Sequence, residues 1–220
     1  QNILSNIDNF IGTSSWSIIA TFLCLDFSSN EIEEILLNID TKNLKDFNTN
    51  NILNFFNIYG IDDAKNIERI INILFKIKLK KNNITFKELY EITNKNLIIC
   101  ATCLNTNEAV YFNYINSPDF SVCKAIIMSI SIPLLFKPVL YEDNYYVDGG
   151  LTNHYPINYF NDKKYTLGIL ISSSLTKRNE INSIEDYLYS ILCCSNTKLI
   201  KDCYSEYKDN TILIENDYNF

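Results

Sequence analysis

A serine-rich segment, Gly12-Thr13-Ser14-Ser15-Trp16, lies between an apolar stretch and an apolar run that is typical of a buried helix. This is the context of a nucleophile elbow, in which a sharp strand-to-helix turn presents a serine hydroxyl at the tip of a sheet. The turn requires small residues two positions before and after the serine, so that strand and helix can approach. For Ser14, Gly12 meets the first requirement. Trp16 fails the second and is expected to widen the crossing or cover the serine.

Two alternatives apply to this segment. Ser15 could be the nucleophile, because Thr13 and Ser17 are both fairly small, although Gly12 favours Ser14. The serines could also simply cap the helix that follows them. If Ser14 is the nucleophile, the backbone N–H of Ser15 at the helix N-terminus is placed to donate to an oxyanion.

A second candidate is the aspartate of Asp148-Gly149-Gly150, which follows the expected strand Tyr145–Val147. A carboxylate at the C-terminal edge of a parallel sheet lies where α/β proteins build their sites. An aspartate that caps a glycine turn has the same local sequence. Facing a serine, Asp148 would form a dyad in which the carboxylate takes the serine proton and later activates water.

The single histidine, His154, would complete a hydrolase triad in the chain order Ser14, Asp148, His154. However, Asp148 and His154 are only six residues apart and are expected to leave the sheet in one loop, whereas a triad usually needs two loops to converge. The dyad is therefore the preferred interpretation, and a triad esterase is kept as an alternative.

The segments that contain and surround these residues are expected to alternate between strands and helices. Strands are expected at residues 7–11, 97–103, 109–112, 138–141, 145–147, 165–171 and 211–214, and helices at 17–27, 31–38, 62–78, 120–131 and 184–203. A capping pair, Asn30 and Glu33, is expected to open the helix 31–38. This alternation predicts an α/β fold with a largely parallel sheet, and no linker divides residues 1–220 into more than one domain.

Composition excludes several function classes. The net charge of −7 argues against nucleic acid as a partner and disfavours membrane binding by charge alone. The five scattered glycines leave no window for a phosphate-binding loop. Seven cysteines without regular spacing indicate a reducing compartment, so a cytoplasmic location is expected. Cys100 and Cys103 should lie on opposite faces of one strand and therefore should not share a metal.

A basic run closes the expected helix 62–78 and continues beyond it, comprising Lys76, Lys78, Lys80 and Lys81. Lysines at this position complement the negative end of a helix dipole, which is the preferred interpretation. A patch for lipid headgroups is the alternative.

Two segments are distinctive in their order and spacing, Ser129-Ile-Ser-Ile-Pro-Leu-Leu-Phe-Lys-Pro-Val139 and Tyr146-Val-Asp-Gly-Gly-Leu-Thr-Asn153, and they are supported by residues 84–91, 97–106, 108–112 and 117–119. These segments give the chain a resemblance to the patatin-like phospholipase domain, which covers nearly the whole chain and is densest from Ile84 to Pro156. It implies a three-layer α/β/α sandwich with a mostly parallel central sheet, with Ser14 as nucleophile and Asp148 as its partner. It also implies hydrolysis of acyl esters of glycerolipids, with no cofactor and no calcium or other metal. Membrane lipid or lysolipid would be the substrate, reached by peripheral membrane contact.

The family places a first strand and a Gly-rich oxyanion loop before the elbow, and this chain, which begins at Gln1, contains neither. Residues 1–220 are therefore expected to form a single patatin-like domain without that strand and loop. Within the chain, only the Ser15 N–H is placed to donate to an oxyanion. A catalytically impaired domain that binds lipid or a partner is thus the alternative to a lipid acyl hydrolase.

Overall fold

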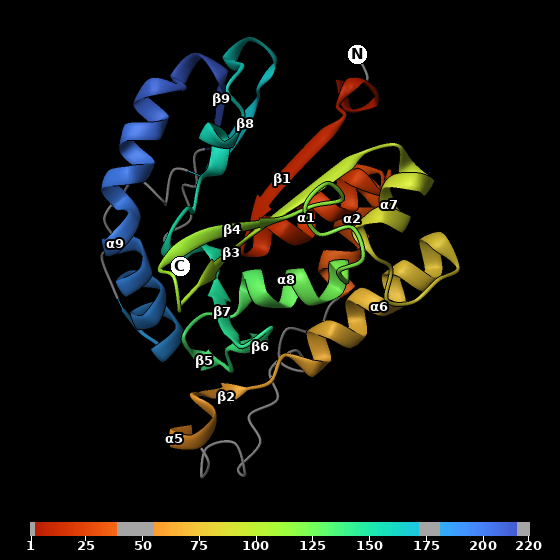
Figure 1. Cartoon of the computed structure of the whole chain (residues 1–220). Coiled ribbons are helices and arrows are strands. Elements are labelled where there is room, and N and C mark those ends of the chain that lie inside the picture. The colour runs from red at the N-terminus through yellow and green to blue at the C-terminus, as the bar shows by residue number, and fades with distance from the viewer. Residues whose placement is uncertain (1–2, 39–54, 172–180, 215–220) are drawn as a thin grey trace.

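The computed structural model describes residues 3–38, 55–171 and 181–214 (Figure 1). A five-stranded sheet forms its centre, with β3 (Asn96–Cys103) as the strand that pairs with most neighbours. Every residue of β3 is buried, because elements pack on both faces of this strand. The other four strands are β1 (Asn9–Thr13), β4 (Glu108–Phe112), β6 (Val139–Tyr141) and β7 (Asn144–Asp148).

Strand directions in this sheet are mixed. The expected parallel direction holds for β1 and β3, and for two small sheets, β2 (Gly60–Asp62) with β5 (Leu134–Phe136) and β8 (Gly168–Ile171) with β9 (Thr211–Ile214). The pairs β3–β4, β3–β7 and β6–β7 are antiparallel. Tight turns explain part of this pattern: Glu142 and Asp143 both have positive φ, as a two-residue type I′ hairpin between β6 and β7 requires.

The register of the sheet brings β1 and β7 together. β1 pairs with β3 up to Thr13 opposite Cys100, and β7 pairs with the remainder of β3, with Asp148 opposite Ala101. Because β4 occupies the other edge of β3 over the same residues, β1 and β7 lie end to end along one edge. Both strands end at this junction, so the residue after Thr13 and the last residue of β7 are neighbours in space.

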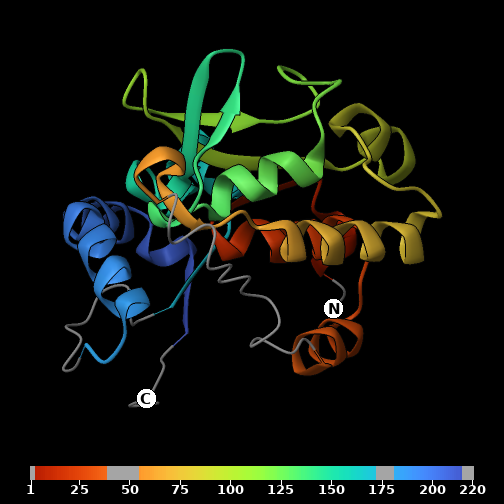
Figure 2. The ribbon, with the colours of Figure 1, turned by 90° about the horizontal axis from the view of Figure 1, so that it is seen from below.

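Helices cover one face of the sheet and enclose the main core. They are α1 (Ser15–Cys24), α6 (Lys65–Leu79), α7 (Phe86–Thr93) and α8 (Val122–Ile130), and Figure 2 shows α6 and α8 side by side. Alternate residues of β3, including Leu97, Ile99 and Cys103, contribute to this core. α2 (Ser29–Asn38) also packs on this core through Ile32 and Ile35, and the remaining short helices of this half of the chain are η1 (Ile3–Asn6) and α5 (Phe55–Ile58).

The opposite face of β3 meets the segment that follows β7. Thr102 Oγ1 lies 2.9 Å from Thr152 Oγ1, and Cys100 Sγ lies 3.9 Å from the Asn153 carbonyl oxygen. Cys100 and Cys103 are therefore on opposite faces, as their spacing predicts. On this side are η2 (Gly149–Leu151), η3 (Pro156–Tyr159), η4 (Lys163–Tyr165), α9 (Ile184–Glu206) and η6 (Lys208–Asn210).

A second, smaller core joins α9 to β8 and to the segment before it. Its buried members are Tyr155, Ile157, Leu170, Ile200 and Tyr207. Figure 1 shows α9, β8 and β9 on the side of the molecule away from α6 and α7. Helices on one side and α9 on the other flank the sheet, which confirms the α/β class.

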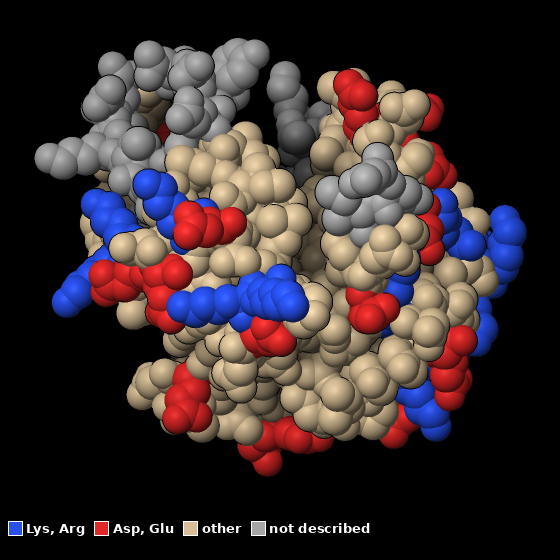
Figure 3. Space-filling view, turned by 90° about the horizontal axis from the view of Figure 1, so that it is seen from above, with Lys and Arg blue, Asp and Glu red and all other residues tan. Residues whose placement is uncertain are grey.

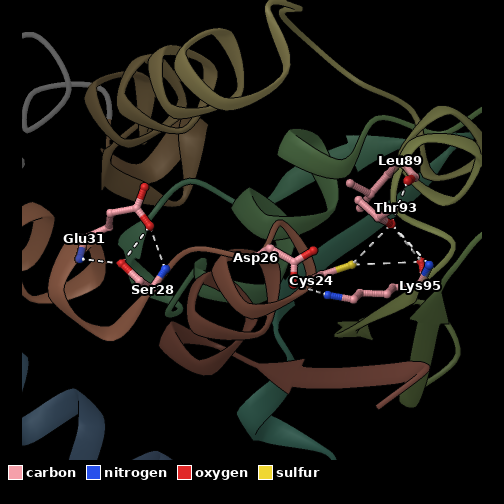
Figure 4. Close-up of polar contacts among 7 residues, drawn as sticks. All are labelled: Cys24, Asp26, Ser28, Glu31, Leu89, Thr93 and Lys95. Carbon is pink, nitrogen blue, oxygen red and sulfur yellow. Dashed lines mark hydrogen bonds and ion pairs between the residues drawn. The ribbon is translucent and has the colours of Figure 1, made fainter. Parts of the chain in front are cut away.

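Two helix starts differ from the sequence-based expectation. α2 is opened by Ser28 and Glu31, not by Asn30 and Glu33: the Glu31 carboxylate accepts from the Ser28 backbone N–H at 2.7 Å (Figure 4). α6 begins at Lys65 and not at Asp62, because Asp62 ends β2, a strand too short to leave a periodic pattern. The helix α7 is absent from the sequence-based expectation, and it begins with a capping box between Thr85 and Glu88.

Lysines at the end of α6 bond to groups of three elements. Lys80 Nζ donates to the Ile77 carbonyl of α6, which is the contact that the helix-end interpretation predicts. Lys78 and Lys81 instead form ion pairs with Glu31 of α2 and Glu88 of α7. Acidic and basic side chains are interspersed over the face drawn in Figure 3. No helix in residues 3–38, 55–171 and 181–214 combines the length and the apolar character needed to cross a bilayer.

Candidate active site

The turn between β1 and α1 holds Ser14 in a strained conformation. Its φ of 56° and ψ of −135° fall outside the regions that non-glycine residues ordinarily occupy, at a cost of about 1–3 kcal/mol. The Ser14 side chain makes no capping bond to the helix that it precedes. Instead, Ser14 Oγ donates a hydrogen bond to Asp148 Oδ2 at 2.7 Å. The helix-cap interpretation of this serine is therefore wrong, since its hydroxyl points across the strand junction.

Close approach of strand and helix at this turn depends on Gly12. A Cβ at position 12 would lie 2.4 Å from the Trp16 carbonyl oxygen and 2.7 Å from Ser17 Cα, which leaves no room for a side chain. The main chain of Trp16 makes this contact, and its side chain is half-buried. The indole therefore does not widen the crossing, because the approach is tight with tryptophan in place; that it covers Ser14 stays a prediction.

Asp148 is almost fully enclosed, with 2% of its surface exposed. Its Oδ1 accepts from the Gly150 backbone N–H at 2.7 Å, which leaves Oδ2 for Ser14. Burial raises the pKa of the Asp148 carboxyl to about 6, although the hydrogen bonds from Ser14 and Gly150 lower it in part. At neutral pH the group is ionised, and it is a stronger base than an ordinary aspartate. Asp148 therefore caps the glycine turn through Oδ1 and contacts Ser14 through Oδ2.

Both glycines after Asp148 allow close contacts. A Cβ at Gly149 would lie 2.3 Å from the Cys100 carbonyl oxygen, so this residue lets the chain pass directly over β3. A Cβ at Gly150 would lie 2.9 Å from both Asp148 Oδ1 and His154 Nδ1. The backbone position of Asp148 is fixed further by its N–H, which donates to the Ser131 carbonyl at 2.8 Å, and by its own carbonyl, which accepts from Thr102 Oγ1 at 2.8 Å.

His154 lies beside this turn but not between the two residues of the pair. Ser14 Oγ and Asp148 Oδ2 are in direct contact at 2.7 Å, which leaves no position for an imidazole between them. Burial lowers the pKa of His154, so the ring is neutral at pH 7. The structure thus brings Ser14, Asp148, Gly12, Gly149 and Gly150 together, as expected, without the relay that a triad requires.

A comparison with protein-family models matches residues 1–161 to the patatin-like phospholipases. This match covers well over half of the chain. The chain belongs to the patatin-like phospholipase family.

Relatives support this membership. The chain is similar to the "Uncharacterized protein R571" of Acanthamoeba polyphaga mimivirus, with 33% identity over 96% of this chain and 73% of that protein. It is also 33% identical to the "Probable lipid hydrolase 463L" of Invertebrate iridescent virus 6, over 70% of this chain and 53% of that protein. The chain thus spans about half the length of the relative that is named a lipid hydrolase.

The fold is also found in a solved structure. VipD from Legionella pneumophila superposes with a TM-score of 0.58 at 14% sequence identity, over 96% of this chain and 56% of VipD. At this identity the likeness concerns the fold alone, and it confirms the patatin-like architecture.

In this patatin-like chain, Ser15 is the first residue of α1 and is exposed. Its N–H is one of the first helical donors, which have no acceptor within the helix, and the positive end of the helix dipole lies at the same place. An oxyanion formed at the Ser14 hydroxyl would be next to this group. No group of three or more His, Cys, Asp and Glu side chains suited to a metal occurs among the described residues.

Two residues that support the site were missed at the sequence level. Ser129, within the family-like run 129–139, accepts from the Ser14 backbone N–H at 2.9 Å. Asn196 of α9 donates to the carbonyls of Gly150 and of Leu151, the latter at 3.1 Å. Ser129 is the first residue of the run 129–139 that carries the family resemblance, so the sequence contains a signal for it. Nothing in the sequence of α9 marks the second, because its contact depends on how the helix packs against η2.

Proposed function

We propose that this chain is a lipid acyl hydrolase that cleaves fatty-acyl esters of glycerolipids and phosphoglycerolipids through a Ser14–Asp148 dyad. The observation that carries this proposal is the hydrogen bond from Ser14 Oγ, held in a strained turn at a helix N-terminus, to the buried Asp148 carboxylate at 2.7 Å. A buried base with a raised pKa, in direct contact with a hydroxyl, is the arrangement that activates a serine. Membership of the patatin-like phospholipases supports hydrolysis of lipids in general.

In the first half-reaction, Ser14 Oγ forms a bond to the ester carbonyl carbon while its proton moves to Asp148 Oδ2. The carbonyl oxygen becomes an oxyanion beside the Ser15 N–H. Collapse of this intermediate breaks the bond to the alcohol oxygen, which takes the proton from Asp148 and leaves as the free glycerol hydroxyl. The acyl group remains as an ester of Ser14.

In the second half-reaction, water attacks the acyl carbonyl and gives a proton to Asp148. The bond between the acyl carbon and Ser14 Oγ then breaks, and Oγ recovers a proton from Asp148 as the fatty acid is released. The sum is ester plus water to acid plus alcohol. Every proton is carried by Asp148, so the scheme contains no step that needs a metal or cofactor.

The substrate class proposed is membrane phospholipid or lysophospholipid, so the activity is of the phospholipase A or lysophospholipase type. The name of the iridescent-virus relative, a probable lipid hydrolase, favours a lipid over other esters. We further propose that residues 1–220 act as one domain, in the cytoplasm, and reach their substrate by peripheral contact with a membrane.

Labelling with a fluorophosphonate, which reacts with activated serines, tests this proposal on the full-length protein. We expect the label on Ser14, located by mass spectrometry of peptides. Ser14→Ala should abolish labelling, whereas the matched control Ser15→Ala should retain it. Fatty-acid release from phosphatidylcholine and lysophosphatidylcholine vesicles should follow the same pattern and should persist in EDTA.

The same experiment separates the enzyme from a domain that binds lipid without turnover. Binding to vesicles with no labelling of Ser14 and no fatty-acid release would support the binding domain. Labelling of Ser15 instead of Ser14 would shift the elbow by one residue. Loss of release in EDTA would contradict the metal-independent scheme.

A further inference from the structure

The side chain of Ser129 connects the nucleophile to the central strand. Ser129 lies in the last turn of α8 and is completely buried. Its Oγ accepts a hydrogen bond from the Ser14 backbone N–H at 2.9 Å and donates one to the Cys100 carbonyl at 2.6 Å. The hydroxyl therefore bridges main-chain groups of two neighbouring elements at the point where β1 leaves the sheet.

This bridge lies where the main chain is strained. Ser14 has a positive φ and directly follows the last residue of β1, and its partly buried N–H needs an acceptor. Ser129 supplies that acceptor. The acceptor itself is fixed, because Ser129 is held at its other side by β3 and belongs to a rigid helix.

We propose that Ser129 is a positioning residue: it holds the Ser14 backbone in the strained turn and thereby directs Ser14 Oγ toward Asp148. This inference rests on the proposed function, since it assigns how the same nucleophile is aimed. Ser129 itself does not touch the reacting atoms. Its effect is expected on the rate of attack by Ser14 and not on the binding of the ester.

Ser131 provides a matched control at the same helix end. It is also completely buried, and its hydroxyl donates to the Ile127 carbonyl at 2.6 Å, the same distance at which Ser129 donates to Cys100. Among the described residues the Ser131 hydroxyl has no bond to Ser14 or Asp148, and the Ser131 carbonyl that accepts from the Asp148 N–H is kept in the alanine variant. Replacing either serine by alanine thus removes one buried hydroxyl-to-carbonyl bond, but only Ser129→Ala removes the acceptor of the Ser14 N–H.

The test compares Ser129→Ala and Ser131→Ala in the full-length protein by thermal unfolding, by kcat and KM on a short-chain ester, and by the rate constant for fluorophosphonate labelling of Ser14. Both variants should lose thermal stability, and Ser129→Ala should lose more, because it breaks two hydrogen bonds and Ser131→Ala breaks one. Ser129→Ala should lose about 10- to 100-fold in kcat and in labelling rate with little change in KM, because small displacements of a reacting atom are costly. The kcat loss of Ser131→Ala should be at least about fivefold smaller.

Equal kcat losses in the two variants, or an unchanged labelling rate in Ser129→Ala, would overturn the inference. Should Ser129→Ala fail to fold, Ser129→Cys retains the volume and a weak acceptor and should give an intermediate rate. Wild-type kcat and labelling rate in Ser129→Cys would also overturn it. The two proposals fail in different ways: absence of label on wild-type Ser14 rejects the proposed function, whereas labelling that is equal in wild type and all variants rejects only the role of Ser129.

Discussion

Two buried aspartates end strands of this protein in nearly the same local structure. Asp62 is the last residue of β2 and is 1% exposed, and its Oδ1 accepts from the backbone N–H two residues later at 2.7 Å. Asp148 is the last residue of β7 and is 2% exposed, with the same contact at the same distance. The local turn therefore does not distinguish them.

The difference lies in what each strand meets. Within the part of the chain that the structure describes, β2 pairs only with the three-residue strand β5, and the Asp62 carbonyl accepts from the Lys137 N–H at 2.8 Å. β7 ends against the end of β1 on the same edge of β3, so the second carboxylate oxygen of Asp148 receives the Ser14 hydroxyl. A buried aspartate at a strand end thus becomes a candidate base only through a neighbour that is far away in sequence.

The same substitution at both positions is the most direct test of whether the two aspartates differ in their effect on activity. Asp148→Asn should lower kcat by about 10²- to 10⁴-fold, because an amide cannot take the serine proton. Asp62→Asn should leave kcat close to the wild-type value. Initial rates on a short-chain ester, together with a thermal melt of each variant, provide the measurement. Comparable losses of activity in two folded variants would remove the distinction between the two aspartates.

The pH dependence of kcat/KM gives a second test of this difference. Because burial raises the pKa of the Asp148 carboxyl to about 6, and only the ionised form is a base, kcat/KM should fall about tenfold per pH unit below that value. Asp62→Asn should show the same acid limb as wild type. A kcat/KM that stays constant down to pH 4.5 would exclude Asp148 from the role of base.

The ionisation of Asp148 should make thermal stability fall as the pH rises, whereas activity should rise. A carboxyl with a raised folded-state pKa stabilises the fold fully below its unfolded pKa of about 4, and this contribution is lost as the pH rises through about 6. Above pH 6 the buried charge costs on the order of 3 kcal/mol. Asp148→Asn should therefore melt at a higher temperature than wild type at pH 8, with a smaller difference at pH 4. The same pair of melts on Asp62→Asn shows whether the gain belongs to the site.

The smallest effect is expected at His154. This residue lies beside Asp148 across Gly150, but the serine proton passes directly to the carboxylate. His154→Ala should change kcat by less than about threefold, within the range of a neighbouring packing change. A steady-state kinetic comparison with Asp148→Asn decides the matter. If the two variants were equally inactive, the dyad would have to give way to a triad.

Much of this site follows from sequence. The elbow around Gly12 and Ser14, and the Asp-Gly-Gly turn after a strand, each have a local physical requirement that can be read from residue types. The buried run that forms β3 is also clear from its apolar character. The start of α7 also has a local signal, because Thr85 is followed three residues later by Glu88, the pattern of a capping box.

Other features could not be predicted from one sequence. The hairpin between β6 and β7 turns at Glu142 and Asp143, which lack the glycine that usually marks such a turn. The alternation of strands and helices alone predicts that β7 runs parallel to its neighbours. In the structure β7 runs antiparallel to β3 and ends at β1. Register between strands depends on packing across the whole sheet, so residue spacing alone does not give it.

The end-to-end placement of β1 and β7 also bears on how the protein is made. Ser14 and Asp148 are 134 positions apart, so during synthesis the serine leaves the ribosome long before its partner exists. A nascent chain can complete α1 and its turn early, whereas β7, the second strand of its hairpin with β6, can dock only after it has been synthesised. Under the proposed function, such a chain carries a serine without a base and does not attack the membranes around it. Recovery of ester hydrolysis during refolding would then report on the closing of the sheet, one of the last steps in acquiring the native topology.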